Sequence, residues 1–126
     1  MRKAVYENPV AATIFANAAL DKYVAVVTNS TGRSAPAGAG VMPDHITMED
    51  ATFQGEAIRG AVPDGNVILI EAGGEVSIGD NVMSNASGKA VEATAGNAIM
   101  GKALTAGASG EIIAIQFNYR GQVPTP

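Results

Sequence analysis

One turn motif occurs twice in this chain, 56 residues apart, and this internal duplication most constrains the fold. The motif reads Asn-x-(Ser/Thr)-Gly-(Arg/Lys) and occupies residues 29–33 and 85–89. The Asn side chain starts a tight turn by bonding to nearby backbone, and Gly accepts the positive φ that a chain reversal needs. Apolar residues flank both copies, so each predicts a β-hairpin. Two related β units are therefore expected.

The similarity continues further along the chain at a different spacing. Gly55–Gly60 resembles Gly101–Ala106, and Asp64–Ile70 resembles Ser109–Ile115. The matched residues lie about 46 positions apart here, so the first unit is expected to carry an insertion relative to the second, at about Val41–Thr52. Four of its residues are candidates for contact with a neighbouring subunit: Met42, His45, Ile46 and Met48.

The composition favours strands over helices. The chain has 22 Val and Ile residues against 3 Leu, together with 15 Gly in 126 residues. β-Branched residues suit a pleated surface, and short strands between glycine turns are typical of small sandwiches and barrels. We expect strands at 23–28, 56–59, 66–71, 81–84, 89–93, 98–104 and 111–118. The predicted fold is all-β, a small β-sandwich or barrel-like domain of two related units with an extended N-terminal arm.

The predicted organisation has three parts. Residues 1–19 form the N-terminal arm, residues 20–118 form the β domain with repeat units at about 20–71 and 76–118, and residues 119–126 form a C-terminal tail. The arm is rich in apolar residues without polar alternation, which would be a liability on a free monomer. It is therefore expected to pack on its own domain or on a partner.

Little in the chain suggests catalysis. It has no Cys and a single His, so thiolate zinc sites, cysteine nucleophiles and histidine clusters are excluded. Gly96–Ala103 fits the glycine-lysine pattern of a phosphate-binding loop, but Ala103 stands where Ser or Thr should hold magnesium, and the segment is expected to be a strand. His45 and Glu49 provide only two ligands for a metal. No catalytic residue, cofactor or metal is expected.

The charge and hydropathy patterns limit the classes of partner that the chain is expected to bind. The chain carries a formal net charge of −4 with 8 Lys and Arg residues, which are scattered, so a phosphate backbone is not an expected ligand. The longest strongly apolar run, Val67–Ile70, is far shorter than the ~20 residues that cross a membrane. Neither nucleic acid nor a membrane is an expected partner.

The second unit resembles a known family. Val76–Val82, Gly88–Val91, Gly101–Leu104 and Gly107–Ile115 resemble the small phage capsid cement, or head decoration, proteins, a family once labelled phage recombinases. The resemblance covers roughly residues 65–117 and rests on glycine-turn spacing. It implies a compact β fold on the outer surface of a phage capsid, as a homotrimer or alternatively a homodimer.

The resemblance also implies a role for the arm, which in this family reaches onto the major capsid protein. The arm residues expected at that interface are Arg2, Val5, Tyr6, Pro9, Val10, Ile14 and Phe15. The expected function is to bind the phage head and stabilise the capsid lattice. Two alternatives remain: a β binding module of a phage tail or baseplate, and a nucleotide-binding recombinase.

Overall fold

The computed structural model describes residues 10–124, which form strands, bridges and turns with no helix. No segment within these residues is therefore a helix that could cross a membrane. The strands are β1 (Ala11–Phe15), β2 (Ala25–Thr28), β3 (Ser34–Pro36), β4 (His45–Thr47), β5 (Ala57–Ala61), β6 (Val67–Glu71), β7 (Asn81–Ser84), β8 (Ala90–Glu92), β9 (Gly101–Ala103) and β10 (Ile112–Phe117).

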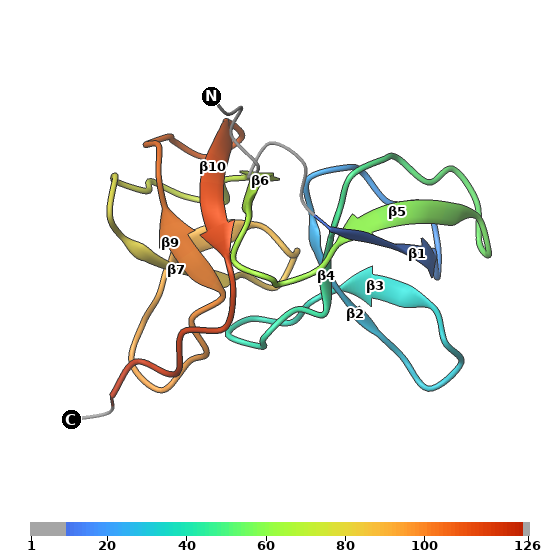
Figure 1. The fold of residues 1–126 in the computed structure, drawn as a ribbon, viewed down its shortest axis with the longest axis horizontal. Helices are drawn as coiled ribbons and strands as arrows, with labels where there is room; N and C mark the ends of the chain where they lie inside the picture. Colours follow the sequence, from blue (N-terminus) through green and yellow to red (C-terminus); the bar gives the residue numbers. More distant parts are fainter. Residues whose placement is uncertain (1–9, 125–126) are drawn as a thin grey trace.

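The ten strands form two antiparallel sheets with the same connectivity (Figure 1). The first sheet has the order β1-β5-β4-β2-β3, and the second has the order β6-β10-β9-β7-β8. The first four strands of the second sheet each begin 56 residues after their counterparts, and the fifth begins 55 residues after. The duplication predicted from the turn motif is confirmed, and it extends over the whole described chain. We call residues 10–65 unit 1 and residues 66–124 unit 2.

The repeated motif forms the same turn in both units. The side-chain oxygen of Asn29 accepts hydrogen bonds from the N–H groups of Thr31 and Arg33, at 2.9 and 3.1 Å. The Asn85 oxygen accepts from residues 87 and 89 in the same way, at 2.9 and 3.0 Å. Gly32 and Gly88 have φ of 81° and 78°. The predicted Asn and Gly turn is therefore confirmed, and it connects β2 to β3 and β7 to β8.

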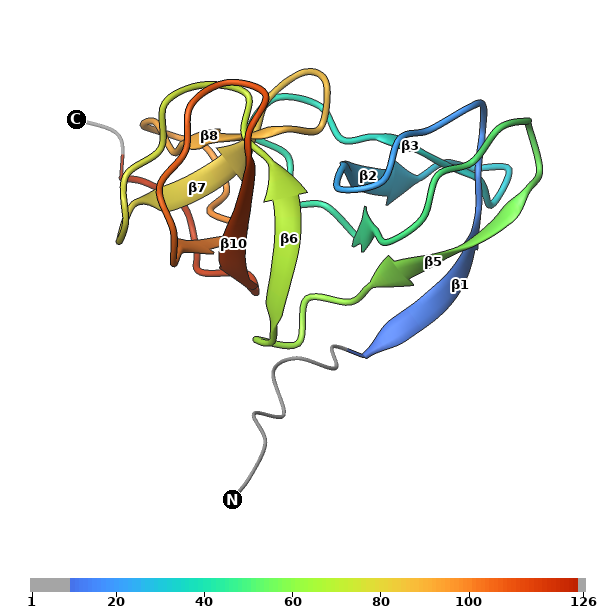
Figure 2. The same ribbon diagram turned by 90° about the horizontal axis from the view of Figure 1, so that it is seen from above.

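Each sheet curls until its two edges approach. A bridge from Ala16 to Ser34 joins the residue after β1 to the start of β3, and the bridge from Ala72 to Ala90 does the same in unit 2. Each bridge pairs backbone groups that would otherwise be free at these edges, which limits edge-to-edge aggregation at that point. Seen from above in Figure 2, the two curled sheets sit side by side.

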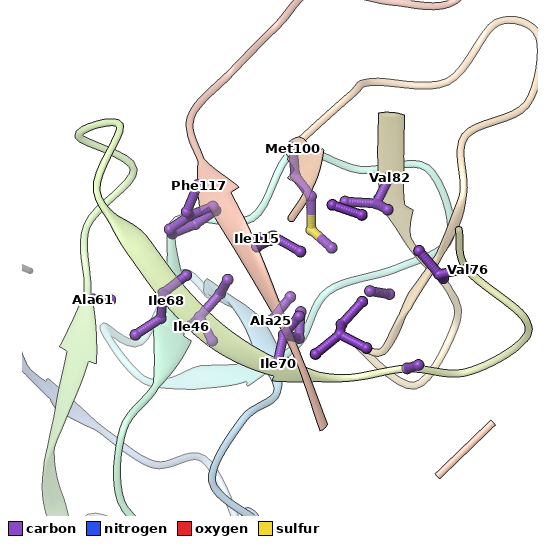
Figure 3. Close-up of a cluster of buried hydrophobic side chains, with 14 of the residues drawn as sticks. Ala25, Ile46, Ala61, Ile68, Ile70, Val76, Val82, Met100, Ile115 and Phe117 are labelled. Atoms are coloured by element: carbon purple, nitrogen blue, oxygen red, sulfur yellow. The ribbon is translucent and has the colours of Figure 1, made fainter. Parts of the chain in front are cut away.

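The two units share one hydrophobic core (Figure 3). Its residues include Ile70, Met100, Ile115 and Phe117 of unit 2, all fully buried. Unit 1 contributes to the same cluster through four residues: Ala25, Ala37, Ile46 and Ala61. A second, smaller cluster lies within unit 1 and consists of Ile14, Ala16, Leu20, Val24, Val26, Ala51 and Ile58.

Backbone hydrogen bonds also join the units. The N–H of Ala25 donates to the carbonyl of Gly88 at 2.7 Å, and the N–H of Glu71 donates to the carbonyl of Tyr23 at 2.9 Å. A side chain on Gly88 would meet the Ala25 carbonyl oxygen, so the glycine permits this close approach. With these backbone hydrogen bonds and a shared hydrophobic core, the units form a single packed body.

The structure differs from the predicted organisation at two segments. Residues 11–15 are not part of an extended arm but form β1, which pairs along its length with β5. Val41–Thr52 is not an insertion, because it contains β4, the counterpart of β9. Gly55 therefore corresponds to Gly110, and both precede the last strand of their unit with φ near 90°. The earlier match to Gly101 was wrong because it aligned the fifth strand of one unit with the fourth of the other.

A glycine comparison tests the turn geometry. Gly79 has φ of 91°, and a Cβ built on it would meet no atom within 4 Å. Gly79→Ala should therefore lower the free energy of unfolding by about 1–2 kcal/mol through backbone strain alone. Urea denaturation measures this. Gly74→Ala is the control, because Gly74 has no positive φ and its Cβ would make ordinary contact at 3.6 Å, so its stability should change little.

A core substitution tests whether the 41–52 segment is part of the shared hydrophobic core. Ile46 is fully buried in the core shared by both units, so Ile46→Ala should cost about 2–5 kcal/mol while unfolding remains one transition. Deleting residues 41–52 should abolish folding, as judged by circular dichroism. A folded deletion variant of normal stability would contradict the shared core.

Candidate protein-binding surfaces

The structure describes only some of the arm residues that were predicted to contact the capsid protein. Arg2, Val5, Tyr6 and Pro9 lie outside the described part of the chain. Val10 and Phe15 are exposed, as an interface requires. Ile14 is buried in the unit 1 cluster, opposite Ile58 on β5. Ile14 therefore belongs to the core, because successive residues of a strand point to opposite faces.

The predicted inter-subunit residues of the 41–52 segment face inward. Ile46 lies in the shared core, and Met42 and Met48 pack against that core while partly buried. His45 is half-buried beside Gly60, where a Cβ would lie 2.9–3.0 Å from Ile14 and His45 atoms. Ile46 is therefore a core residue, and Met42, His45 and Met48 are only partly exposed.

The segments that could bind phosphate or a metal have structural roles in the fold. Gly101 and Lys102 open strand β9, so the glycine-lysine pair does not precede a helix as a phosphate-binding loop requires. The Glu49 carboxylate accepts a 2.8 Å hydrogen bond from the N–H of Arg59. Among residues 10–124 no group of three potential metal ligands comes together.

A row of aliphatic side chains crosses the outer face of the unit 2 sheet. Leu69 on β6 lies directly opposite Ala114 on β10, and the N–H of Leu104 bonds to the carbonyl of Ala114 at 2.8 Å. Ile112 lies two residues from Ala114 and so shares this outer face. The exposed fractions are 43% for Leu69, 40% for Leu104 and 44% for Ile112.

Ile78 adds to this surface from a turn. The N–H of its neighbour Gly79 donates to the carbonyl of Ala103 at 2.8 Å, which places the turn beside Leu104. Ile78 is 70% exposed. Leu69, Ile78, Leu104 and Ile112 together are called the aliphatic face below.

Unit 1 has no equivalent of the aliphatic face, although it has the same fold. The corresponding positions hold Thr13, Lys22, Met48 and Ala57. The fold therefore does not require four aliphatic side chains on the outer face. Exposed apolar groups that gather in one place without a structural reason mark an interaction site.

Unit 1 exposes a different apolar surface at its far end. Phe15 ends β1 and is 48% exposed, and Phe53 lies in the turn before β5 and is 60% exposed. The N–H of Gly55 donates to the carbonyl of Ala16 at 2.7 Å, so the two segments are adjacent. In unit 2 the counterpart of Phe15 is Glu71, and the counterpart turn carries Ser109. Phe15 and Phe53 together are called the phenylalanine tip.

The aliphatic face was missed by sequence analysis, although a signal was present. Val67–Ile70 and Ile112–Ile115 are apolar at consecutive positions and not at alternate ones. A strand with both faces apolar is either buried on both sides or exposes one apolar face. In a domain this small the second outcome holds for β6 and β10.

Comparison with known proteins identifies a structural neighbour. The fold matches the N base of the head fiber gp8.5 in bacteriophage phi29 with a TM-score of 0.74 and 18% sequence identity. The match covers 92% of this chain and 98% of that chain, so the two share the complete two-unit architecture. A scan against protein-family models and a search of curated proteins each gave no match.

The environment of His45 predicts a pH dependence of stability. Burial lowers the pKa of His45 below the usual 6.5, and the nearby Asp44 carboxylate opposes this only in part. The folded state therefore binds this proton less readily than the unfolded state, and stability should fall as the pH drops below about 6.5. Urea denaturation at several pH values measures the decline.

His45→Gln isolates this contribution, because it removes the imidazole and leaves every carboxylate in place. The difference in unfolding free energy between wild type and His45→Gln should shift against the wild type between neutral and mildly acidic pH. A constant difference across that range would mean that His45 titrates alike in the folded and unfolded states.

Proposed function

We propose that this protein is a structural component of a phage particle, a decoration or cement protein that binds the outer surface of the head and stabilises the major capsid protein lattice. Its proposed partners are the major capsid protein and further copies of itself, in a homotrimer. The proposed role is structural and uses no catalytic residue, cofactor or metal.

The observation that carries this proposal is the aliphatic face. Unit 1 shows that the same fold is built without it, so its four exposed side chains serve contact with another chain. A protein with such a cluster of exposed apolar side chains suits binding to other proteins in an assembly.

The fold comparison supports the phage head as the assembly to which this protein binds. The neighbour that shares the two-unit architecture is a head fiber base in a phage. The glycine-turn pattern of unit 2 independently resembles the capsid cement family. Both lines of support favour the phage head as the setting.

Stabilisation would follow from binding itself. A protein that binds the assembled lattice and not the dissociated subunits shifts the equilibrium toward the intact shell. An oligomer that engages several capsid subunits at once gains avidity without new contacts in each copy. The proposed anchor on the shell is the segment before β1, with Arg2, Val5, Tyr6 and Pro9, together with exposed Val10.

Co-sedimentation with expanded heads of the same phage tests the proposed function. The full chain should saturate the heads at hundreds of copies per particle and raise their resistance to heat. A variant lacking residues 1–9 should bind at least tenfold more weakly, because it loses the proposed anchor while β1 remains intact.

The results distinguish the proposed anchor in residues 1–9 from head binding itself. Equal binding by both proteins would remove the anchor from residues 1–9 and leave head binding standing. Absence of the full chain from heads, or a few copies at the tail, would overturn head decoration. Deletion of residues 1–15 would not test the anchor by itself, because it also removes β1 and buried Ile14.

A further inference from the structure

The aliphatic face lies within reach of the nine residues that precede Val10. The N–H of Val62 donates to the carbonyl of Val10 at 3.0 Å, so the first described residue lies beside Val62. Figure 2 shows that β1 and β6 begin at the same end of the molecule. Leu69 is seven positions after Val62 in the sequence, and nine extended residues span about 30 Å, farther than seven can. Residues 1–9 are therefore long enough to reach the aliphatic face of their own chain.

We propose that residues 1–9 bind the aliphatic face of the same copy in the free protein. The docking concerns the protein before it meets a head. Its role, which is to hold the proposed anchor until the head is bound, rests on the proposed function.

The charged residues beside the aliphatic face are arranged in order along β6. At the start of β6, Lys102 lies opposite Gln116, which in turn lies opposite Val67. At the other end of β6, Glu71 lies opposite Ile112, and Glu111 directly precedes Ile112. The end of the face nearest Val10 is therefore basic, and the far end is acidic.

Most of these charges have no ion-pair partner within the described chain. The single ion pair found among residues 10–124 joins Glu71 to Lys89 at 3.0 Å. Lys102 and Glu111 are exposed, and Asp80, two positions after Ile78, is partly exposed. Hydrogen bonds from the N–H groups of residues 77 and 108 fix the carboxylates of Asp80 and Glu111, at 2.9 and 2.7 Å. Two positioned carboxylates and one lysine thus remain available to a partner.

The sequence of residues 1–9 carries its charges in the matching order. Glu7 is three positions before Val10, whereas Arg2 and Lys3 are farthest from it, and Val5 and Tyr6 lie between. Five extended residues, the spacing from Glu7 to Arg2, span about 17 Å, and the four steps along β6 span about 13 Å. A segment running from Val10 along β6 would bring its carboxylate to the basic end and its cations to the acidic end, with apolar side chains over the face.

The size of the face favours an occupant that is tethered to it. A stable contact between separate proteins buries about 800 Å² on each partner, and four exposed aliphatic side chains make a small surface by that measure. A segment of the same chain meets the face at an effective concentration in the mM range, so a small contact suffices. Covering the face also removes an exposed apolar patch from the free protein.

The phenylalanine tip fits the same segment less well. Phe15 ends β1, so the tip lies at the end of that strand opposite Val10. Lys22 and Arg59 donate backbone N–H groups to the carboxylates of Asp50 and Glu49, which places two cations beside the acidic loop. Arg2 and Lys3 would meet like charges there.

Docking of this kind would couple the two surfaces used at the head. While residues 1–9 cover the aliphatic face, neither the anchor nor the face is available to other chains. Transfer of the anchor to the shell would uncover the face for contact with another chain. The protein would then expose its apolar surface only where a partner can cover it.

Tryptophan fluorescence of the free protein tests the docking. The chain contains no Trp, so Tyr6→Trp places a single reporter in residues 1–9. Its emission should lie at shorter wavelength, and its quenching by acrylamide should be weaker, than in a synthetic peptide of residues 1–9 with the same substitution. Adding Leu69→Thr with Leu104→Thr should move both quantities to the values of the peptide, because the apolar side chains of the face are lost.

The matched control changes the other apolar surface. Phe15→Thr with Phe53→Thr in the Tyr6→Trp protein should leave emission and quenching unchanged; all four positions are exposed, and circular dichroism checks each fold. Arg2→Glu with Lys3→Glu provides a second variant, which leaves the described strands untouched and should raise the quenching.

Three results would overturn the proposal. They are emission of the Tyr6→Trp protein equal to that of the peptide, a response to the tip substitutions and not to the face substitutions, and a shift in emission on dilution, which would assign the contact to a second copy. Because no phage head is present, failure of head binding leaves these measurements unaffected, and failure of docking leaves head binding standing.

Discussion

The structure depends on the burial of unit 1 side chains in the core of unit 2. Ile46 and three alanines of unit 1 enter a cluster that otherwise belongs to β6–β10, and backbone hydrogen bonds cross the same boundary. A five-stranded unit of about sixty residues buries too little apolar surface to be stable with much margin. Duplication solves this because one unit closes the core of the other, and it also frees the outer surfaces to diverge.

That divergence links the fold to the function. The two units keep the same hairpin, the same edge closure and the same glycine before the last strand, which are the features that the backbone requires. They differ on their outer faces, where unit 2 has Leu69, Ile78, Leu104 and Ile112 and unit 1 has polar or smaller residues and a partly buried Met. A duplicated chain thus holds a built-in comparison that separates residues needed for folding from residues available for binding.

The sequence predicts the all-β class, the duplication and most strands, because β-branched runs and Asn-Gly turn chemistry act locally. It does not predict β1 or β4 as strands. Ala11–Phe15 shows no clear polar alternation, and His45–Thr47 is three residues between Pro43-Asp44 and an acidic loop. Both are strands because of tertiary pairing with β5, a long-range interaction that no local pattern records. The aliphatic face was missed for a related reason: outward and inward apolar residues look alike until the register is known.

A three-dimensional reconstruction of a phage head carrying this protein tests the account most directly. The account predicts density on the outer surface of the shell, with the aliphatic face of each copy in contact with another chain. Density confined to the tail, or isolated copies on the shell with the aliphatic face exposed to solvent, would contradict it.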